Sequence, residues 1–292
     1  MKNPEFKIDT YVINMDSAPD RMEHMKTQLD CLSIPFIRQA GVVGAELLQP
    51  HSEFSDWSYK YLHGRRWAPR ELGCYLSHIQ CLRNFLQTDA PYALILEDDV
   101  KLDDNIKGIL ESAIEHASDW NMLRLSSVNH GKWWSVRKLG SHSLAVCLTR
   151  EKGAGGYLVD RKAAACMVKK LLPMRLAWDI AFDLEWLLGF KTLGVYPLPV
   201  QQNTEFETQI QQDLGVDHPA HKQLARALAW TEDFLQTSRA QMLRADAFVE
   251  LDMIDLLHQV ADDIYPLAQE QGLHLKLDLP EETVWVLGHF ET

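Results

Sequence analysis

Residues 92–102 read YALILEDDVKL, in which five apolar or aromatic residues run directly into three acidic ones. An apolar run of this length, preceded by the loop-forming DAP at 89–91, is typical of a buried strand. Glu97, Asp98 and Asp99 would then stand where the strand leaves the sheet. Three adjacent carboxylates repel one another unless a cation neutralises them. The stretch therefore predicts a cation-binding strand end, and the alternative is that the acidic residues only form a turn.

The sequence on both sides of this stretch alternates between strand-like and helix-like segments. Helical spacing of apolar residues is clearest in RELGCYLSHIQCLRNFLQ. We expect helices at 17–32, 70–87 and 161–172, and strands at 8–15, 93–96, 122–127, 142–149 and 155–160. Residues 34–44 indicate a strand that enters a glycine-containing loop, and residues 191–200 indicate a strand pair or a strand and a loop. Such alternation predicts an α/β layered domain with a mostly parallel sheet. Ligands bind sheets of this class beyond the carboxyl ends of the strands, where the three carboxylates are expected.

The net charge of −12 is unevenly distributed along the 292 residues. Residues 1–200 hold 24 acidic and 24 basic side chains, whereas residues 201–292 hold 17 acidic and 5 basic ones. This shift predicts two parts, a domain over residues 1–211 and an acidic, helix-rich extension over residues 212–292. A neutral part followed by an acidic one argues against nucleic acid as a partner, because its binding needs basic surface.

Segments that would direct the chain to a membrane are not expected. The N-terminal MKNPEFKIDTYVINMD lacks the apolar centre of a signal peptide, and no stretch approaches the ~20 apolar residues of a transmembrane segment. The five cysteines are odd in number and lack CxxC spacing, which favours reduced thiols. The expected location is therefore the cytoplasm.

The acidic strand end offers a pair of metal ligands. Alternate residues of an extended strand share a face, so Glu97 and Asp99 are predicted to bind the metal while Asp98 points the other way. Hard divalent ions bind carboxylate oxygens and can bridge to a diphosphate. Asp98 is expected either to join the pair through a turn or to orient the ribose of a nucleotide.

Several segments together resemble glycosyltransferase family 25, which includes bacterial lipooligosaccharide galactosyltransferases and collagen galactosyltransferases. They are YVINMDSAPDR, RELGCYLSHIQCL, ALILEDDV, and GAGGYLVDRKAAACMVKKL followed by AWDIAFD. Their order and spacing match across about residues 8–210. The sequence departs from the family pattern at Arg70, where the family commonly has glycine.

The resemblance implies a GT-A-like, Rossmann-type domain that uses a UDP-sugar, often UDP-galactose, with Mn²⁺ or Mg²⁺. The implied enzyme is an inverting hexosyltransferase whose acceptor is a lipooligosaccharide, another saccharide or a lipid-linked saccharide. A divalent cation would stabilise the leaving UDP as a Lewis acid. A lipid-linked acceptor would also bring the enzyme to the inner face of the membrane as a peripheral protein.

An inverting transfer needs a general base that takes the proton of the acceptor hydroxyl. Asp179 matches an acidic position of the family and is the first choice, with Asp183 second. The two lie four residues apart and would share one face of a helix. The alternative is that Asp179 caps the helix that begins there.

The remaining predicted site residues would bind the donor. They are Asn14, Arg21, Glu71, Ser77, His78 and Asp98. Asn14 and Arg21 follow the first strand, and an arginine offers a planar donor fork suited to a diphosphate. The alternatives are an ion pair of Arg21 with Glu23 or Asp16, a helix-capping Glu71, and packing roles for Ser77 and His78.

The acidic extension shows a second, partial resemblance. Residues 248–288 resemble the linker and first part of the ATP-binding domain of sensor histidine kinases, without the phosphoacceptor box or the ATP-binding motifs. Kinase activity is therefore not expected, whereas an apolar helical stripe could form a homodimer. The alternative function is a non-catalytic scaffold or signalling protein, in which a degenerate transferase domain carries a kinase-derived dimerisation segment.

Overall fold

The computed structural model describes residues 8–63, 67–128, 131, 133–147, 152–183, 188–203 and 206, and the short strands 251–252 and 285–286. The chain divides into two compact units, residues 1–225 and 226–292. In the second unit, β11 (Leu251–Asp252) pairs antiparallel with β12 (Trp285–Val286). The boundary predicted at 211/212, the helix-rich extension and most of the kinase-like segment lie outside the described residues.

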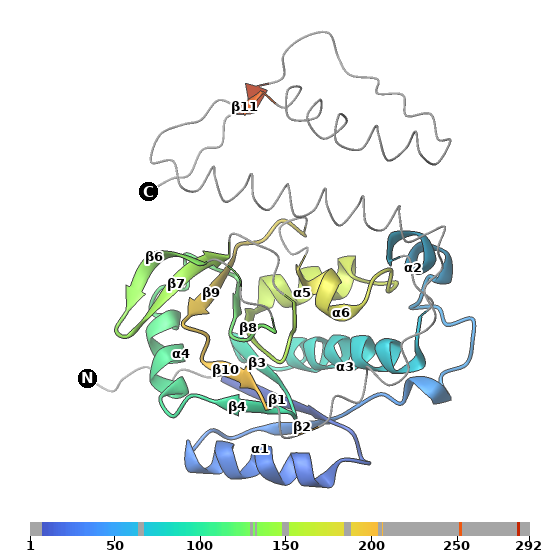
Figure 1. Cartoon of the computed structure of the whole chain (residues 1–292), viewed down its shortest axis with the longest axis horizontal. Helices are drawn as coiled ribbons and strands as arrows, with labels where there is room; N and C mark the ends of the chain where they lie inside the picture. The colour runs from blue at the N-terminus through green and yellow to red at the C-terminus, as the bar shows by residue number, and fades with distance from the viewer. Residues whose placement is uncertain are drawn as a thin grey trace. The chain divides into compact units, whose positions relative to one another are not determined.

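The first unit is built on an eight-stranded sheet with the order β2-β1-β3-β8-β5-β9-β7-β6 (Figure 1). Its strands are β1 (Ile8–Asn14), β2 (Ile37–Ala40), β3 (Tyr92–Glu97), β5 (Met122–Arg124), β6 (Trp133–Leu139), β7 (His142–Cys147), β8 (Gly156–Asp160) and β9 (Thr192–Tyr196). Six strands run in one direction, and β7 and β8 run in the other. The predicted α/β class and mostly parallel sheet are confirmed.

Helices cover both faces of this sheet (Figure 1). One face packs against α3 (Pro69–Leu86), α5 (Arg161–Lys170) and α6 (Trp178–Asp183), and the other against α1 (Pro19–Cys31) and α4 (Ile106–Ile114). The other elements among the described residues of this unit are η1 (Gly44–Glu46), α2 (Asp56–His63), β4 (Val100–Leu102) and β10 (Val200–Gln202). The strand at β6 and the pair formed by β4 and β10 were not predicted.

Strand β3 shows why the chain folds into these layers. Ala93 and Ile95 belong to the core on the α3 side, and Leu94 and Leu96 belong to the core on the α1 side. All four side chains are fully buried or nearly so. A strand buried on both faces reads as an unbroken apolar run, because each face needs every second residue. The same alternation decides where the acidic residues that follow β3 are directed.

Candidate active site

Glu97 and Asp98 leave the end of β3 toward opposite faces of the sheet. Glu97 continues the series of Ala93 and Ile95 and reaches His78 on α3. Asp98 contacts Arg21 on α1 and Asn14 at the end of β1. Asp99 does not continue the strand, because residues 98 and 99 form a turn before β4. The strand alternation that paired Glu97 with Asp99 in the sequence therefore ends at Glu97. Where the Asp99 side chain lies relative to Glu97 depends on the turn at residues 98–99.

Asp98 is bound by two side chains and is almost fully buried. Its Oδ2 accepts a hydrogen bond from Asn14 Nδ2 at 2.7 Å, and its Oδ1 lies 3.1 Å from Arg21 Nη1. Burial raises the pKa of Asp98, and the bonds from Asn14 and Arg21 oppose that rise. Asn14 Nδ2 also donates to the Ala18 carbonyl at 2.8 Å, which joins the end of β1 to the start of α1. Asp98 is thus a fixed, internally satisfied carboxylate.

Asp99 is less well compensated than Asp98. Its Oδ2 lies 3.4 Å from Arg21 Nη1, a long contact. Burial, followed by the negative charge of Glu97, raises the pKa of Asp99 to about 7, although Arg21 acts in the opposite direction. The backbone carbonyl of Asp99 accepts from Asn203 N–H at 2.7 Å, which fixes the turn against the end of β10. The charge of Glu97 thus opposes ionisation of Asp99, in line with the repulsion expected from the sequence, and Arg21 offsets only part of the rise in the pKa.

The ion pair proposed between Arg21 and Glu23 or Asp16 is not what the structure shows. Arg21 pairs with Asp98 and Asp99, and its guanidinium lies over the Phe206 ring at 5.2 Å. Asp16 pairs instead with Arg38. The predicted donor-binding residues Asn14, Arg21 and Asp98 are therefore brought together, beside Asp99, at the carboxyl ends of β1 and β3.

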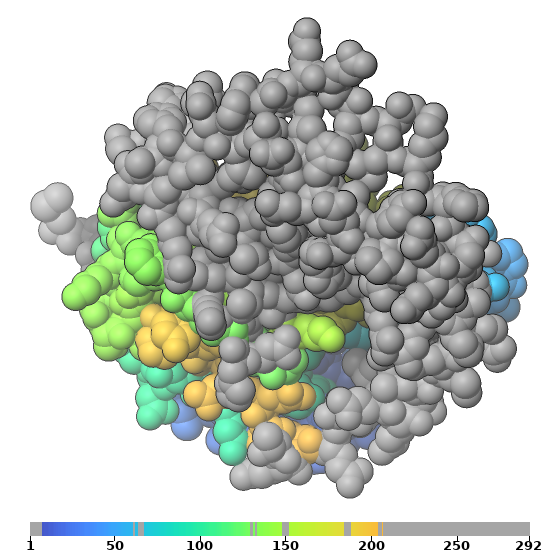
Figure 2. All heavy atoms as spheres, turned by 45° about the horizontal axis from the view of Figure 1, so that its top comes forward, coloured from blue at the N-terminus to red at the C-terminus, as the bar shows by residue number. Residues whose placement is uncertain are grey.

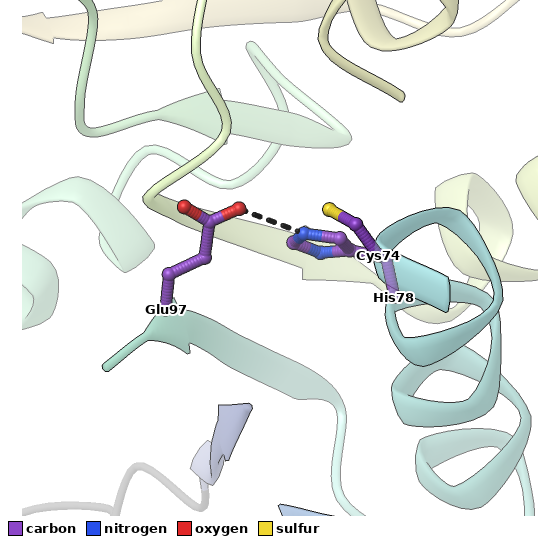
Figure 3. A group of neighbouring side chains, drawn as sticks. All are labelled: Cys74, His78 and Glu97. Carbon is purple, nitrogen blue, oxygen red and sulfur yellow. Dashed lines mark hydrogen bonds and ion pairs between the residues drawn. The ribbon is translucent and has the colours of Figure 1, made fainter. Parts of the chain in front are cut away.

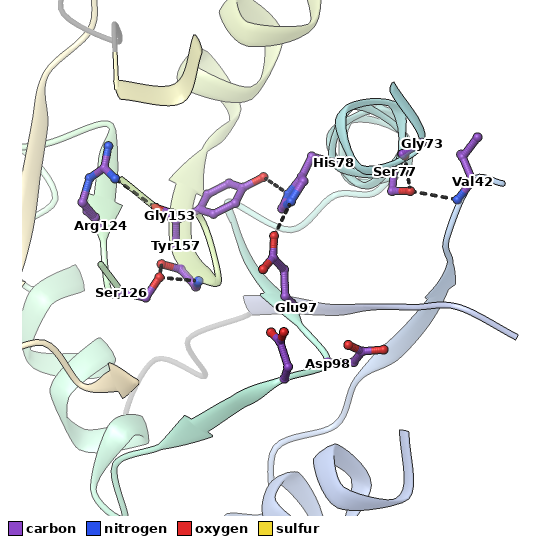
Figure 4. Close-up of polar contacts among 12 residues, drawn as sticks. Val42, Gly73, Ser77, His78, Glu97, Asp98, Arg124, Ser126, Gly153 and Tyr157 are labelled. Carbon is purple, nitrogen blue, oxygen red and sulfur yellow. Dashed lines mark hydrogen bonds and ion pairs between the residues drawn. The ribbon is translucent and has the colours of Figure 1, made fainter. Parts of the chain in front are cut away.

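On the other face of β3, Glu97 belongs to a chain of hydrogen bonds with His78 and Tyr157 (Figure 4). Glu97 Oε1 lies 3.1 Å from His78 Nε2, and His78 Nδ1 lies 3.1 Å from the Tyr157 hydroxyl. The His78 ring is fully buried, whereas a third of the Glu97 side chain is exposed. Glu97 thus connects a buried hydrogen-bond chain with the exterior.

Cys74 lies one helical turn before His78 on α3, and its Sγ, a ring nitrogen of His78 and a Glu97 oxygen lie within 4.8 Å of one another (Figure 3). Burial and then the charges of Glu97, Asp179, Asp99 and Glu71 raise the pKa of the Cys74 thiol well above its usual range. The negative charges of several predicted site carboxylates therefore all act on the Cys74 thiol.

The two candidates for the general base differ in their surroundings. Asp179 is half-buried near the start of α6, and its Oδ1 accepts from the Ile180 N–H at 2.9 Å. Asp183 is almost fully buried, and its Oδ1 lies 3.0 Å from Arg124 Nη2. Arg124 also donates to the Gly153 carbonyl at 3.0 Å and packs over the Phe182 ring. Asp183 is an ion-pair partner inside the protein, which leaves Asp179 as the accessible carboxylate of the two.

Glu71 and Ser77, two further predicted donor-binding residues, make the helix-capping and packing contacts that were the alternatives to donor binding. Glu71 Oε2 accepts from the Ala68 N–H and the Tyr59 hydroxyl, both at 2.8 Å, and so caps α3. Ser77 accepts from the Val42 N–H at 2.8 Å and donates to the Gly73 carbonyl at 2.7 Å (Figure 4). Both side chains are almost fully buried.

The contact that Ser77 makes needs Gly73 as well. A Cβ at Gly73 would meet the Val42 carbonyl oxygen at 2.3 Å. The glycine therefore lets the segment after β2 approach α3, and Ser77 holds it there. Both residues lie in the predicted RELGCYLSHIQCL helix, whose match thus includes fold-forming as well as site residues.

Sequence reasoning missed four residues that position the site. Tyr157 bonds His78, Arg124 bonds Asp183, and Arg38 donates to Asn14 Oδ1 at 2.9 Å. The fourth is Trp178, whose ring stacks on His78 with centroids 4.7 Å apart. The sequence signal for these residues was a polar or aromatic side chain in or beside an element expected to be buried. Such a side chain needs a partner, because buried polar groups are hydrogen-bonded. The signal did not say which partner each would find.

An aromatic pair lies on the surface formed by β6 and the end of β9. Trp133 stacks on Tyr196 with centroids 5.9 Å apart, and Trp134 next to it is 44% exposed. Residues of β6 and β7, in green, and of β9 and the segment that follows it, in orange, lie next to one another in the space-filling view (Figure 2). Within the described part of the chain, no helix has the length and apolar character needed to cross a bilayer.

Comparison with known proteins places this arrangement in a family. The chain is 25% identical over 231 residues to the lipooligosaccharide biosynthesis protein lic2B of Haemophilus influenzae, covering 70% of this chain and 84% of that protein. It is 28% identical over 128 residues to procollagen galactosyltransferase 1-B of Xenopus laevis, covering 40% of this chain and 21% of that protein.

One solved structure, an active-site mutant of LgtC, aligns with 76% of this chain and 95% of its own at 11% identity, with a TM-score of 0.35. A similarity this low carries no argument, and the fold assignment rests on the strand order. The sequence profile of glycosyltransferase family 25 (LPS biosynthesis protein) matches residues 7–182, which include β1, α3, β3, β8 and α6 up to its last residue but one. The chain belongs to glycosyltransferase family 25 and is a glycosyltransferase.

Proposed function

We propose that this glycosyltransferase transfers galactose from UDP-galactose, with inversion, to a lipooligosaccharide or another saccharide acceptor. The names of two relatives support the choice, because one is a lipooligosaccharide biosynthesis protein and the other a procollagen galactosyltransferase. The donor, acceptor and stereochemistry are the proposed parts. Membership of the family is the established part.

The observation that carries the proposal is the polar group at the carboxyl ends of the neighbouring parallel strands β1 and β3. Asn14 ends β1 and Glu97 ends β3, and Ile13 is in register with Glu97. Arg21, from the first turns of α1, reaches the same place. Because α/β sheets bind ligands beyond the carboxyl ends of their strands, we assign the nucleotide diphosphate to this edge.

The side chains here fit a hard divalent cation. Glu97 and Asp99 supply carboxylate oxygens, the ligand type that Mn²⁺ and Mg²⁺ take, and the charge of Glu97 is felt at Asp99. We propose these two residues as the metal ligands, as the sequence predicted. A bound cation would offset the charge that develops on the leaving diphosphate. Asp98 is held by Asn14 and Arg21 and supports the site from the α1 side.

Asp179 is the proposed general base. Its position next to Trp178, which stacks on His78, brings the start of α6 to the same face of the sheet as Glu97. A half-buried carboxylate can accept the proton of an acceptor hydroxyl as the hydroxyl attacks the sugar. Asp183 is not proposed as the base, because Arg124 already occupies its carboxylate.

The cytoplasmic location, peripheral contact with the inner face of a membrane and a homodimer through residues 212–292 remain proposals. The dimer has a direct test. Deleting residues 212–292 should change the protein from a two-chain to a one-chain species, counted as the mass from light scattering divided by the mass of one chain. An unchanged number of chains would remove the dimer from the proposal without touching the transferase activity.

The test of the proposed function combines binding and turnover. Thermal unfolding is first followed with a panel of UDP-sugars, because a ligand that binds only the folded state raises its stability. UDP release is then measured with and without Mn²⁺. We expect UDP-galactose to give the largest stabilisation, and Glu97→Gln and Asp99→Asn to lower Mn²⁺-dependent turnover by about a thousandfold, as expected for a lost interaction of several kcal/mol.

Asp30→Asn is the matched control, since Asp30 is an exposed carboxylate paired only with Lys26 among the described residues. Its turnover should equal that of the wild type. If no UDP-sugar binds and no acceptor is glycosylated, the non-catalytic scaffold becomes the better account. Turnover that is unaffected by chelators would instead refute the metal while leaving the transferase.

A further inference from the structure

His78 is at the centre of a buried cluster on the α3 side of the sheet. Its two ring nitrogens lie 3.1 Å from Glu97 Oε1 and 3.1 Å from the Tyr157 hydroxyl. The Trp178 ring stacks on the imidazole at an interplanar angle of 9°, with centroids 4.7 Å apart. The residue is fully buried, so the ring is held in place by two hydrogen bonds and one stacked face.

This environment argues against the direct donor contact predicted for His78. A ring with no exposed surface cannot touch a sugar nucleotide unless the cluster opens, and opening would break both hydrogen bonds. Glu97, by contrast, has one oxygen toward His78 and a third of its side chain exposed. Of the two hydrogen-bonded residues, His78 and Glu97, it is therefore Glu97 that can contact a ligand.

Cys74 Sγ, a ring nitrogen of His78 and a Glu97 oxygen lie close together, but we do not assign them as a second metal site for a soft cation. Zinc-type sites need a thiolate and an unprotonated ring nitrogen that is free to coordinate. Burial, and then the charges of nearby carboxylates, raise the pKa of the Cys74 thiol and disfavour the thiolate. Both nitrogens of His78 already have partners (Figure 4). The cluster is instead complete as a hydrogen-bond chain.

The direction of these hydrogen bonds follows from their ends. A carboxylate only accepts, so we assign the tautomer of a neutral His78 ring in which Nε2 carries the proton and donates to Glu97. In this assignment Nδ1 accepts from the Tyr157 hydroxyl, which completes the chain. In this tautomer every group is satisfied. One Glu97 oxygen is held toward α3, and Oε2 remains on the side of Gly155, where a Cβ would lie 3.9 Å from it.

We propose that His78 is a positioning residue, which, fixed by Tyr157 and Trp178, orients the Glu97 carboxylate for the divalent cation. The inference rests on the proposed role of Glu97 as a metal ligand. A glutamate at a strand end can rotate about its side-chain bonds. The hydrogen bond to His78 restricts the rotation of Glu97 before the metal binds. His78 would then act on metal affinity without touching substrate.

The matched variants are His78→Gln and His78→Asn. Both lose the ring and its stacking on Trp178, and the amide nitrogen of glutamine extends toward the position of Nε2, whereas that of asparagine extends only to the position of Nδ1. The glutamine variant therefore keeps a donor for Glu97, and the asparagine variant does not. Tyr157→Phe keeps both rings and removes only the hydroxyl that orients His78.

The measurement is the dissociation constant of Mn²⁺ in the presence of UDP, by calorimetry, with the unfolding temperature recorded for each variant. We expect His78→Asn to weaken Mn²⁺ binding by about 10–100-fold, the usual effect of losing a partner that orients a metal ligand. His78→Gln should recover most of the affinity, and Tyr157→Phe should fall between the two. Equal losses for the two His78 variants would show a packing role and overturn the inference.

Glu97→Gln separates this inference from the proposed function. If Glu97→Gln leaves Mn²⁺ affinity unchanged, or the wild type binds no Mn²⁺, the proposed metal role of Glu97 and this inference fail together, and the proposed sugar transfer stands. If Glu97→Gln weakens binding and His78→Asn does not, only the positioning role is refuted. Should His78→Asn fail to fold, Tyr157→Phe decides, and an unchanged Mn²⁺ affinity in that variant overturns the inference.

Discussion

Glu97 and Asp98 are neighbours at the end of β3, yet their carboxylates are stabilised in different ways. Asp98 is paired with a guanidinium, and a second bond comes from Asn14. Glu97 is bonded to the His78 ring on the other face of the sheet and stays partly exposed. The difference shows how one short acidic run can supply both a structural anchor and a group left able to bind a ligand.

The largest effect should come from breaking the ionic side of this comparison. Arg21→Ala leaves Asp98 buried without its cation, which should lower the free energy of unfolding by about 3–5 kcal/mol. Tyr157→Phe removes one buried hydrogen bond on the α3 side of β3 and should lower the free energy of unfolding by about 1–3 kcal/mol. Urea unfolding followed by circular dichroism measures both.

An exposed ion pair provides the control for that experiment. Lys26 pairs with Asp30 on the surface of α1, so Lys26→Ala should leave the unfolding midpoint unchanged. Equal losses of stability for Arg21→Ala and Tyr157→Phe would show that the two sides of β3 do not differ as described.

The same contrast between anchor and reactive group is expected within α6. Asp183→Asn removes the charge that Arg124 faces inside the protein, and we expect a loss of stability of about 3 kcal/mol. Asp179→Asn should leave the unfolding midpoint near that of the wild type and lower kcat by about 100–10,000-fold, the contribution of a general base. Activity retained by Asp179→Asn but lost by a folded Asp183→Asn would reverse the assignment.

A pH dependence of stability is expected from Asp99. The folded protein raises the pKa of this carboxyl from 3.8 to about 7, so the folded state binds the proton more tightly than the unfolded chain does. The stabilising contribution is complete below pH 4 and is lost as the pH rises toward about 7. Stability should therefore fall less between pH 5 and pH 8 in Asp99→Asn than in the wild type.

Urea unfolding at these two pH values, without added divalent cation, tests the expectation. A steeper fall in Asp99→Asn than in the wild type would contradict it. Added Mn²⁺ should also reduce the fall in the wild type, because the cation replaces the proton in offsetting the charges of Glu97 and Asp99.

Much of the site could be predicted from local sequence. The unbroken apolar run of 92–96 required a strand buried on both faces, and strand alternation then sent Glu97 and Asp98 to opposite sides. The prediction that Glu97 and Asp99 share a face applied strand alternation beyond the end of the strand, because the backbone turns at residues 98–99. Turns next to a strand end depend on what they pack against, here the end of β10.

The sequence by itself determined the α/β layers, the strand end with its carboxylates and the family, because these follow from periodicity and from short motifs. Only the tertiary structure decided which partner each charged or polar group found. Arg21 lies 77 residues from Asp98, Arg124 lies 59 from Asp183 and Tyr157 lies 79 from His78. Partners so far apart in the chain meet only when the helices and strands pack, and their packing makes Asp98 and Asp183 anchors while Glu97 and Asp179 stay accessible.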